Sequence, residues 1–206
     1  MYKKIATVLT IVFQPLIVPS LVIALLFYGI PESTSVPADA KWSLLLLIAV
    51  TTLFIPMFSV MGMKMTSMIP SIYMVSKKER ILPFSMISFF YVITSAFFYF
   101  KLQVDSLMVF TLILITICVL ILTFITVFWR ISAHTTGLGG LVAINIALAQ
   151  KFPNHSLLYP LIGAIILCGA VGSARLFLNA HKPAEIFGGI VLGFTVCFAG
   201  YYFYLF

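Results

Sequence analysis

The chain has 206 residues, of which 63% are hydrophobic and only 8% are charged, and its mean hydropathy is +1.20. A soluble domain has about a quarter charged residues, so this composition excludes a soluble globular protein and indicates that lipid is the solvent for most of the chain. The formal net charge is +7. Because the positive residues are scattered at the ends of apolar segments, they favour lipid head groups or an anionic substrate over nucleic acid.

Apolar segments recur along the whole chain, and a bilayer requires about 20 such residues for each helix. The first segment contains Pro15 and Pro19, which predict a kink or a partly re-entrant helix. It follows Met-Tyr-Lys-Lys, which resembles the start of a signal peptide, but its length favours a retained helix. The fifth segment is short, so we expect an all-α bundle of six to seven transmembrane helices, forming a single domain over residues 1–206. The expected limits are Ile5–Tyr28, Ser43–Met63, Ile81–Phe100, Ser106–Trp129, Thr136–Gln150, Ser156–Ala174 and Ala184–Tyr204.

The cysteines give no sign of a metal site or a disulfide framework. Cys118, Cys168 and Cys197 each lie inside an apolar segment, and no C-x-x-C pair occurs. They are interpreted as small buried hydrophobic residues. We expect neither a metal nor a cofactor.

Polar residues gather in three clusters between the apolar segments. The first polar cluster is SKKERILP (residues 76–83), the second is RISAHTTGLGG (130–140) and the third is ARLFLNAHKPAE (174–185). Two apolar segments separate the first cluster from the second, and two more separate the second from the third. Because an even number of crossings returns the chain to the same side, all three clusters are predicted to share one face of the membrane. His155 is predicted to lie in a solvated loop on the opposite face.

Such a face would hold an anion. Guanidinium groups pair with phosphate oxygens through parallel hydrogen bonds. The start of the fifth helix adds Ser132, Thr135 and backbone amides near Gly137, and a helix N-terminus favours phosphate through its amides and its dipole. The side chains expected to converge on the anion are Lys77, Lys78, Arg80 and Arg175.

Two histidines beside a bound phosphate indicate covalent phosphoryl transfer, in which one ring attacks phosphorus and the other gives a proton to the leaving oxygen. Glu185 follows His181 by four residues, a spacing that places both side chains on one face of a helix and lets the carboxylate orient the ring. Each feature also has a simpler interpretation. Glu185 favours the first turn of a helix for dipole reasons, residues 77–80 resemble a topology signal, and His134 is suited to capping a helix.

Two of the clusters resemble signatures of the type 2 phosphatidic acid phosphatase superfamily. Arg175-x5-His181-x3-Glu185 is similar to the third signature, S-R-x5-H-x3-D, and Ser132-Ala133-His134 is similar to the second, P-S-G-H. Ala174 stands in place of the serine, Glu185 in place of the aspartate and Ala133 in place of the glycine. The first signature, K-x6-R-P, is not reproduced. The signature-bearing region covers residues 76–195.

The resemblance implies a helical membrane phosphatase that works without a metal. It implies that His181 is the nucleophile, that Glu185 orients it and that His134 protonates the leaving alcohol. Phosphate ligands would be Arg175, Ser132, Arg80 and Lys78. The substrate would be a lipid phosphate, such as phosphatidate, phosphatidylglycerol phosphate, a polyprenyl phosphate or a phosphoglycolipid. The only other partners expected are membrane lipids.

Two alternatives remain open at this point. A transporter coupled to protons or anions would place charged residues near the middle of the bilayer, whereas here they lie at segment ends. A non-catalytic lipid-binding protein on the same fold differs from the enzyme only in activity. The orientation is open too: the count of positive residues favours a cytoplasmic site, while the resemblance favours an extracytoplasmic one, which is our expectation for a multi-pass protein of the cell membrane.

Overall fold

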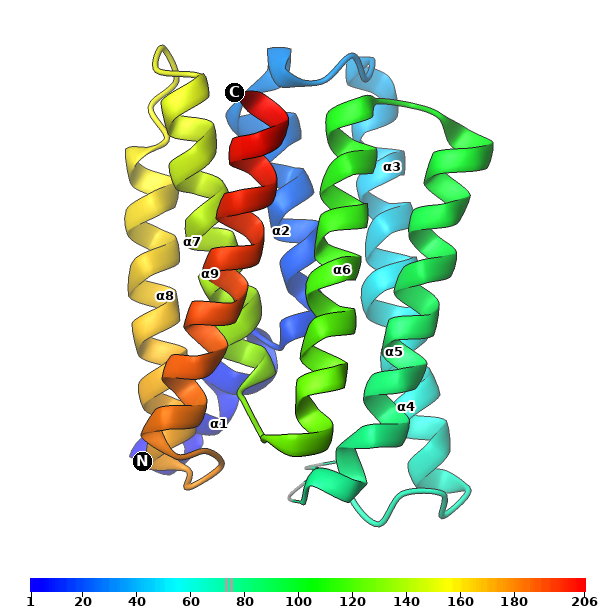
Figure 1. Cartoon of the computed structure of the whole chain (residues 1–206), viewed down its shortest axis with the longest axis vertical. Helices are drawn as coiled ribbons and strands as arrows, with labels where there is room; N and C mark the ends of the chain where they lie inside the picture. Colours follow the sequence, from blue (N-terminus) through cyan, green and yellow to red (C-terminus); the bar gives the residue numbers. More distant parts are fainter. Residues whose placement is uncertain (73, 75) are drawn as a thin grey trace. The chain divides into compact units, whose positions relative to one another are not determined.

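The computed structural model describes residues 1–72, 74 and 76–206, and these residues form helices and turns without a β-strand (Figure 1). Among these described residues, six helices are long and apolar enough to cross a membrane, so the expected all-α membrane bundle is confirmed and the chain is a multi-pass membrane protein. Some of the six combine two or more shorter elements. The six candidates are Tyr2–Gly29, Ala38–Met65, Lys77–Leu102, Ser106–Phe128, Leu158–Phe177 and Pro183–Leu205.

The helices divide into two compact units. Unit 1 contains residues 1–18 and 131–206, and unit 2 contains residues 19–130. The signature-bearing region expected over residues 76–195 falls partly in each unit, and the single-domain organisation stays a prediction.

In unit 2 the long helices are widened at three places by a π-helical turn. These turns end the first apolar segment, interrupt the second and end the third. Helices α5 and α6 pack against each other through hydroxyl pairs, Ser88 with Thr123 at 2.8 Å and Ser95 with Thr116 at 2.7 Å. Hydroxyl pairs of this kind join helices in an apolar environment. The elements are α2 (Val18–Ala24), η2 (Leu25–Gly29), η3 (Pro31–Ser33), α3 (Ala38–Ala49), η4 (Val50–Phe54), α4 (Ile55–Met65), α5 (Lys77–Phe97), η5 (Phe98–Leu102) and α6 (Ser106–Phe128).

The first apolar segment is broken, as its prolines predict. Helix α1 (Tyr2–Val12) ends before Gln14, whose backbone is extended, and the 3₁₀ turn η1 (Pro15–Ile17) leads into α2. Proline lacks a backbone N–H and disfavours the helical conformation in the residue before it, which explains the break at residue 14. In unit 1, α1 packs against α8 and η1 packs against α7.

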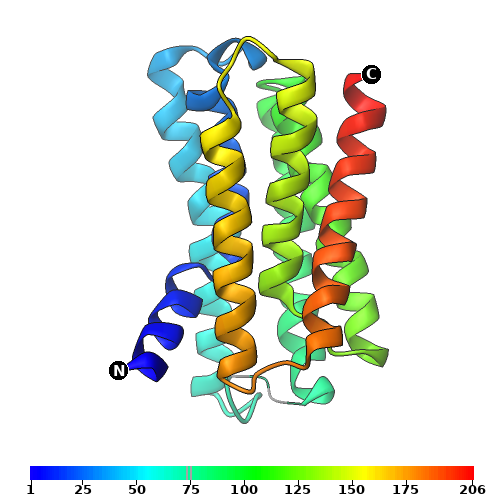
Figure 2. The ribbon, with the colours of Figure 1, turned by 90° about the vertical axis from the view of Figure 1, so that its left-hand side faces the viewer.

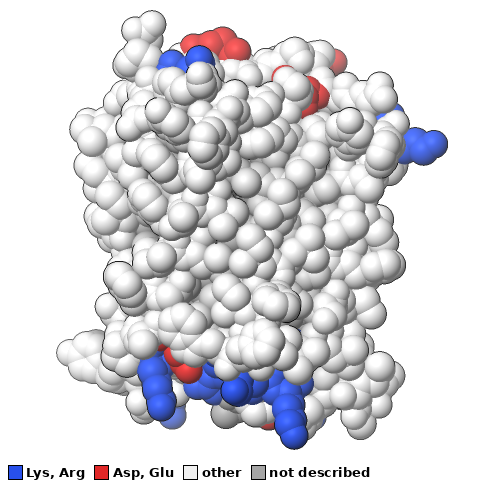
Figure 3. Space-filling model, viewed as in Figure 1, with Lys and Arg blue, Asp and Glu red and all other residues white. Residues whose placement is uncertain are grey.

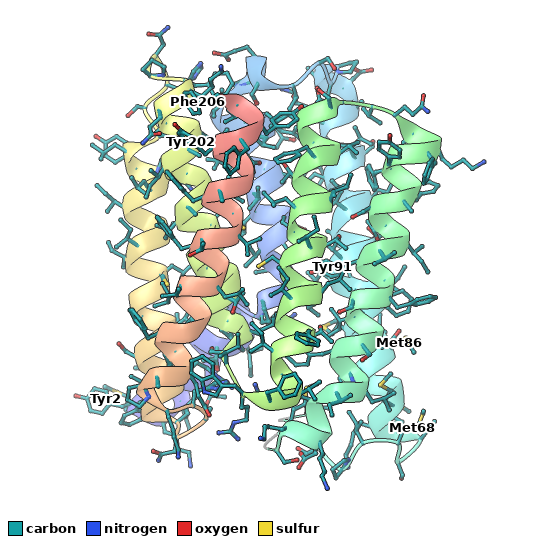
Figure 4. All side chains as sticks on the ribbon, in the orientation of Figure 1. Tyr2, Met68, Met86, Tyr91, Tyr202 and Phe206 are labelled. Atoms are coloured by element: carbon teal, nitrogen blue, oxygen red, sulfur yellow. The ribbon has the colours of Figure 1, made fainter. Side chains whose placement is uncertain are left out.

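Unit 1 is built around α7 (Ala133–Lys151), which lies between α8 (Leu158–Phe177) and α9 (Pro183–Leu205) in Figure 2. Helices α7 and α9 are parallel: the N–H of Ser132 donates to the carbonyl of Glu185 at 3.0 Å at one end, and Nζ of Lys151 donates to the carbonyl of Leu205 at 2.7 Å at the other. Lys151 also lies 5.3 Å from the ring centroid of Phe206, at the aromatic end of α9 (Figure 4). The predicted fifth segment is therefore a helix of 19 residues, close to the 20 residues of α8.

Helices α5 and α7 begin earlier than the apolar pattern predicts, because their caps lie inside the polar clusters. The hydroxyl of Ser76 accepts from the N–H of Glu79 at 3.3 Å, so residues 77–80 form the first turn of α5 and not a loop. Ser132 caps α7 in the same way, accepting from the N–H of Thr135 at 3.4 Å. Serine is a favoured N-cap residue since its side chain satisfies an amide that has no helical partner.

Charged side chains lie near helix ends in both units, and the surface between them is uncharged on the face shown in Figure 3. Cys118, Cys168 and Cys197 are free and buried, which confirms their interpretation as small core residues.

Candidate functional site

The third polar cluster forms the turn between α8 and α9 and contains a buried pair of side chains. Nδ1 of His181 lies 2.9 Å from Oε2 of Glu185, and the two residues are 6% and 8% exposed. The turn is closed by a hydrogen bond from the N–H of Ala180 to the carbonyl of Arg175 at 3.0 Å, and Asn179 has a positive φ of 51°. Asparagine tolerates this left-handed conformation better than most residues. The predicted contact between His181 and Glu185 is confirmed.

The carboxylate of Glu185 is held by a second donor. Its Oε2 also accepts from the backbone N–H of Lys182 at 3.1 Å, which is the residue immediately before α9. A carboxylate oxygen can only accept, so Nδ1 of His181 carries the proton in this contact. In the neutral ring the lone pair is then on Nε2, which is the nitrogen able to act as a nucleophile.

The start of α7 is joined to the start of α9. The N–H of Ser132 donates to the carbonyl of Glu185 at 3.0 Å, and the hydroxyl of Thr135 donates to the carbonyl of Ile186 at 3.0 Å. Ser132 and Thr135 are completely buried. The structure therefore brings the second polar cluster to the same end of unit 1 as the His181–Glu185 pair.

Glycines allow this close approach of α7 and α9. A Cβ on Gly193 would meet the carbonyl oxygen of Thr136, and one on Gly189 would meet the hydroxyl of Thr135. On the other helix, a Cβ on Gly139 would come within 2.7 Å of the carbonyl oxygen of Ile190. The two backbones are in direct contact along this seam, as small residues permit between helices in lipid. The seam fixes the register of Ser132 relative to Glu185.

The predicted anion-binding role of Thr135 and of the amides near Gly137 needs correction. The hydroxyl of Thr135 donates to the carbonyl of Ile186, and its N–H donates to the hydroxyl of Ser132. Gly137 lies in the second turn of α7, past the amides that lack helical partners at a helix start. Because the helix begins at Ala133, only the amides of its first turn are placed to face an anion.

His134 lies on a different side of α7 from the seam. Its Nε2 is 3.1 Å from the carbonyl oxygen of Thr10, near the end of α1. Thr10 is a contact that sequence reasoning missed, since the two residues are 124 positions apart. The only sequence signal near Thr10 is the Gln14-Pro15 break, which ends α1 and leaves its last carbonyls without the donors of a following turn.

Arg175 lies in the last turn of α8, at the same end of unit 1 and half-buried. A positive side chain is favoured there because the C-terminus of a helix carries partial negative charge. Five residues separate it from His181, and the turn between them reverses the chain.

The remaining predicted phosphate ligands belong to unit 2. Arg80 is 4% exposed and its Nε donates to the carbonyl of Met74 at 3.0 Å, while Lys78 is exposed. Lys77 donates to the carbonyl of Phe128 at 3.1 Å, at the end of α6. The approach of Arg80 and Lys78 to His181 stays a prediction.

Within the part of the chain that the structure describes, no group of three or more His, Cys, Asp or Glu side chains is placed to hold a metal ion. The candidate site is thus a buried imidazole–carboxylate pair at the junction of α7, α8 and α9, in a multi-pass helical membrane protein. No protein family, curated protein or solved structure matches the chain.

Proposed function

We propose that this protein is a membrane-integral phosphatase that hydrolyses a lipid phosphate through a phosphohistidine intermediate. The observation that carries the proposal is the pair of His181 and Glu185, buried at the first turn of α9 with the ring oriented by the carboxylate. A histidine held in this way is an activated nucleophile, because the carboxylate stabilises the positive ring that forms on attack.

In the proposed reaction, Nε2 of His181 attacks phosphorus and forms a P–N bond. The bond between phosphorus and the lipid oxygen breaks, and His134 gives a proton to that oxygen. Water then attacks the phosphohistidine, His134 accepts a proton from the water, and inorganic phosphate is released as the P–N bond breaks. General acid–base catalysis of this kind contributes about 10²–10⁴-fold to a rate.

Arg175 and Ser132 are proposed to hold the phosphate in unit 1, and Arg80 and Lys78 stay ligands predicted from the sequence alone. The first-turn amides of α7 and the guanidinium groups would stabilise the charge on the transferring phosphoryl group. The proposed substrates share a phosphate at the bilayer surface and an apolar tail: phosphatidate, phosphatidylglycerol phosphate, a polyprenyl phosphate or a phosphoglycolipid. The tail would lie in the bilayer while the head group reaches the helix ends.

The test is release of inorganic phosphate by the purified protein in detergent, with each of these lipids and with EDTA present. We expect turnover with at least one lipid and its loss, by a factor of at least about 10³, in His181→Ala. His155→Ala is the matched control, since His155 lies in the loop between α7 and α8, at the other end of these helices. Undiminished turnover in His181→Ala would reject the proposal, and trapping of ³²P on the wild-type protein but not on His181→Ala would support it.

We further propose that the site faces the extracytoplasmic side of the cell membrane. This orientation follows the resemblance of the second and third polar clusters and runs against the count of positive residues. In unit 1, Lys3, Lys4, Arg175 and Lys182 belong to the end that carries His181, and Lys151 belongs to the other. Two of these positives, Arg175 and Lys182, belong to the third polar cluster itself, so they bias the count that sets topology.

A further inference from the structure

We propose that the N-terminal helix α1 is part of the active site, because the carbonyl of Thr10 orients His134 for proton transfer. This inference rests on the proposed phosphatase function. It assigns a functional role to a segment that lies outside the predicted signature-bearing region of residues 76–195.

The acceptor is supplied by the way α1 ends. The helix stops at Val12, and the extended backbone of Gln14 followed by Pro15 prevents another turn. Carbonyls in the last turn of a helix lack the amide donors that a following turn would provide. Thr10 is only 6% exposed, so its carbonyl is shielded from water and is suited to a side-chain donor. The imidazole of His134 supplies one, at 3.1 Å.

Contacts on both sides hold this arrangement in place. Helix α1 packs on α8, and the stretch that follows it fits closely on α7, where a Cβ on Gly137 would come within 2.9 Å of Cγ2 of Val18. On its other side the start of α7 is bonded to α9 through Ser132 and Thr135. His134 therefore sits in the first turn of a helix that is fixed to α9 on one side and to the N-terminal segment on the other.

The contact determines which nitrogen of His134 moves a proton. A carbonyl oxygen only accepts, so Nε2 keeps a proton that is hydrogen-bonded to the carbonyl of Thr10. Nδ1 is then the nitrogen that gives and takes a proton during the reaction. In the first step Nδ1 of the imidazolium gives its proton to the lipid oxygen as the P–O bond breaks, leaving a neutral ring. In the second step Nδ1 takes a proton from the attacking water.

The two histidines would thus be oriented by different acceptors that suit different tasks. His181 is paired with the carboxylate of Glu185, which stabilises positive charge on the ring during attack. His134 is paired with a neutral carbonyl at the negative end of α1, which favours the imidazolium, but it also lies in the first turn of α7, whose partial positive charge disfavours it. The ring therefore holds its second proton less strongly than one paired with a carboxylate would. His134 can then release its proton to the leaving group.

The first experiment measures the tautomer directly and does not depend on activity. The full-length protein is labelled with ¹⁵N-histidine, and the ring nitrogens of His134 are assigned in detergent by comparison with His134→Gln. We expect a protonated Nε2 and an unprotonated Nδ1 in the neutral ring. The Nδ1–H tautomer would overturn the proposal.

The second experiment displaces the carbonyl. Val12→Pro removes the last turn of α1, because proline clashes with the preceding turn and disfavours a helical residue before it. We expect kcat to fall by about 10–100-fold, the effect of losing a hydrogen bond to a charged ring, with KM within about twofold. Tyr2→Pro is the matched control, since proline is tolerated at the first position of a helix.

A backbone ester at residue 11 covers the case in which Val12→Pro fails to fold. It weakens the Thr10 carbonyl as an acceptor and changes no side chain. We expect it to lower kcat, as Val12→Pro does. An ester at residue 6, which weakens the carbonyl of Ile5 in the same helix, is its control. Each α1 variant is also made in the His134→Gln protein, whose amide can still donate to Thr10 but cannot transfer a proton.

The two hypotheses fail in different ways. If α1 acts through His134, Val12→Pro lowers the residual kcat of His134→Gln by less than about twofold. An equal loss in both backgrounds, or wild-type kcat in the ester protein, would overturn the role of α1 and leave the phosphatase intact. If the wild-type protein releases no phosphate from any lipid phosphate, the phosphatase proposal fails and this role fails with it, whatever tautomer the spectrum shows.

Discussion

Glu185 uses one oxygen for two purposes. Its Oε2 accepts from Nδ1 of His181 and from the backbone N–H of Lys182, so the carboxylate that orients the ring also satisfies an amide at the start of α9. A glutamate at this position reaches back over the first turn, as it does in a capping box. Ring orientation and helix start are therefore coupled through one side chain.

This coupling predicts the outcome of two substitutions. Glu185→Gln keeps an acceptor for the Lys182 amide but removes the negative charge, so we expect the protein to fold and kcat for lipid phosphate to fall by about 100-fold. Glu185→Asp keeps the charge but shortens the reach, so we expect a smaller loss of kcat together with a lower unfolding temperature. Phosphate release and thermal unfolding in detergent measure the two effects. Equal kcat in Glu185→Gln and the wild type would show that the carboxylate is not needed.

At the residue scale, local contacts could be predicted and distant ones could not. The spacing of His181 and Glu185 predicts a contact within a helix, and the contact is present, but His181 precedes Lys182, the residue before α9. The contact forms because Glu185 reaches back over the first turn of α9. The contact of His134 with Thr10 joins residues that are 124 positions apart, and no pattern in either segment specifies it. The hydroxyl of Thr135 was expected near an anion because the sequence shows only that it is polar. Its hydrogen bond to a carbonyl of α9 depends on the packing of the two helices, which the sequence does not show.

At the element scale, the contact between α7 and α9 depends on the absence of side chains. We expect Gly193→Ala to destabilise the protein by about 3 kcal/mol, the upper range for overpacking. The added Cβ would meet the backbone carbonyl of Thr136, and a helix backbone, unlike a side chain, cannot change rotamer to make room. Gly163→Ala is the matched control: nothing lies within 4 Å of its Cβ position in α8, and alanine is favoured over glycine in a helix by about 0.5–1 kcal/mol.

The buried cysteines supply the measurement for these variants. A thiol-reactive dye reports their exposure as the protein is heated in detergent, and Cys197 lies in the seam, where a Cβ on Gly140 would come within 2.9 Å of its Sγ. We expect the midpoint temperature of cysteine exposure to be lower in Gly193→Ala than in the wild type. In Gly163→Ala we expect it to equal or exceed that of the wild type. If the two alanine variants unfold at the same temperature, the seam does not contribute to stability.

The hydroxyl of Thr135 adds a directed bond to this seam. Thr135→Val keeps the shape of the side chain and removes the donor to the carbonyl of Ile186, so we expect a loss of about 1 kcal/mol. Thr135→Ser keeps the donor and should recover most of that loss. The same thiol assay measures both variants, and identical midpoints for valine and serine would show that the hydrogen bond has no net effect.

The helices themselves could be predicted better than their ends or their burial. Apolar length located all seven helical segments, but α7 is too polar to be counted as a membrane span on composition alone. Its 19 residues extend over about 28 Å, close to the thickness of a bilayer core. Because α7 packs between α8 and α9, it needs less apolar surface than a helix that faces lipid, and it accommodates Asn145 and several glycines.

At the scale of the whole molecule, chain direction could be predicted from the sequence and the packing of the units could not. Counting apolar segments sets which side of the membrane each polar cluster reaches, and in unit 1 the bonds between Ser132 and Glu185 agree with that count. The same count gives no information on how closely two clusters on one face approach each other. The distance from Arg80 or Lys78 to His181 depends on side-chain packing between helices, which crossing parity does not encode.

The crossing count makes a prediction for the complete chain that labelling can check. Helices α5, α6, α7 and α8 separate Lys78 from Lys182, and α8 alone separates Asn154 from Lys182. All three residues are exposed, so each can be replaced by cysteine in a protein whose native cysteines have been removed. We expect Lys78→Cys and Lys182→Cys to react with a membrane-impermeant maleimide from one side of intact cells, and Asn154→Cys to react only after permeabilisation, as the proposed extracytoplasmic site requires. The reverse pattern would place the site in the cytoplasm and keep the shared face. Reaction of Lys78→Cys and Lys182→Cys from opposite sides would separate Arg80 from His181 by a bilayer and remove unit 2 from the phosphate site.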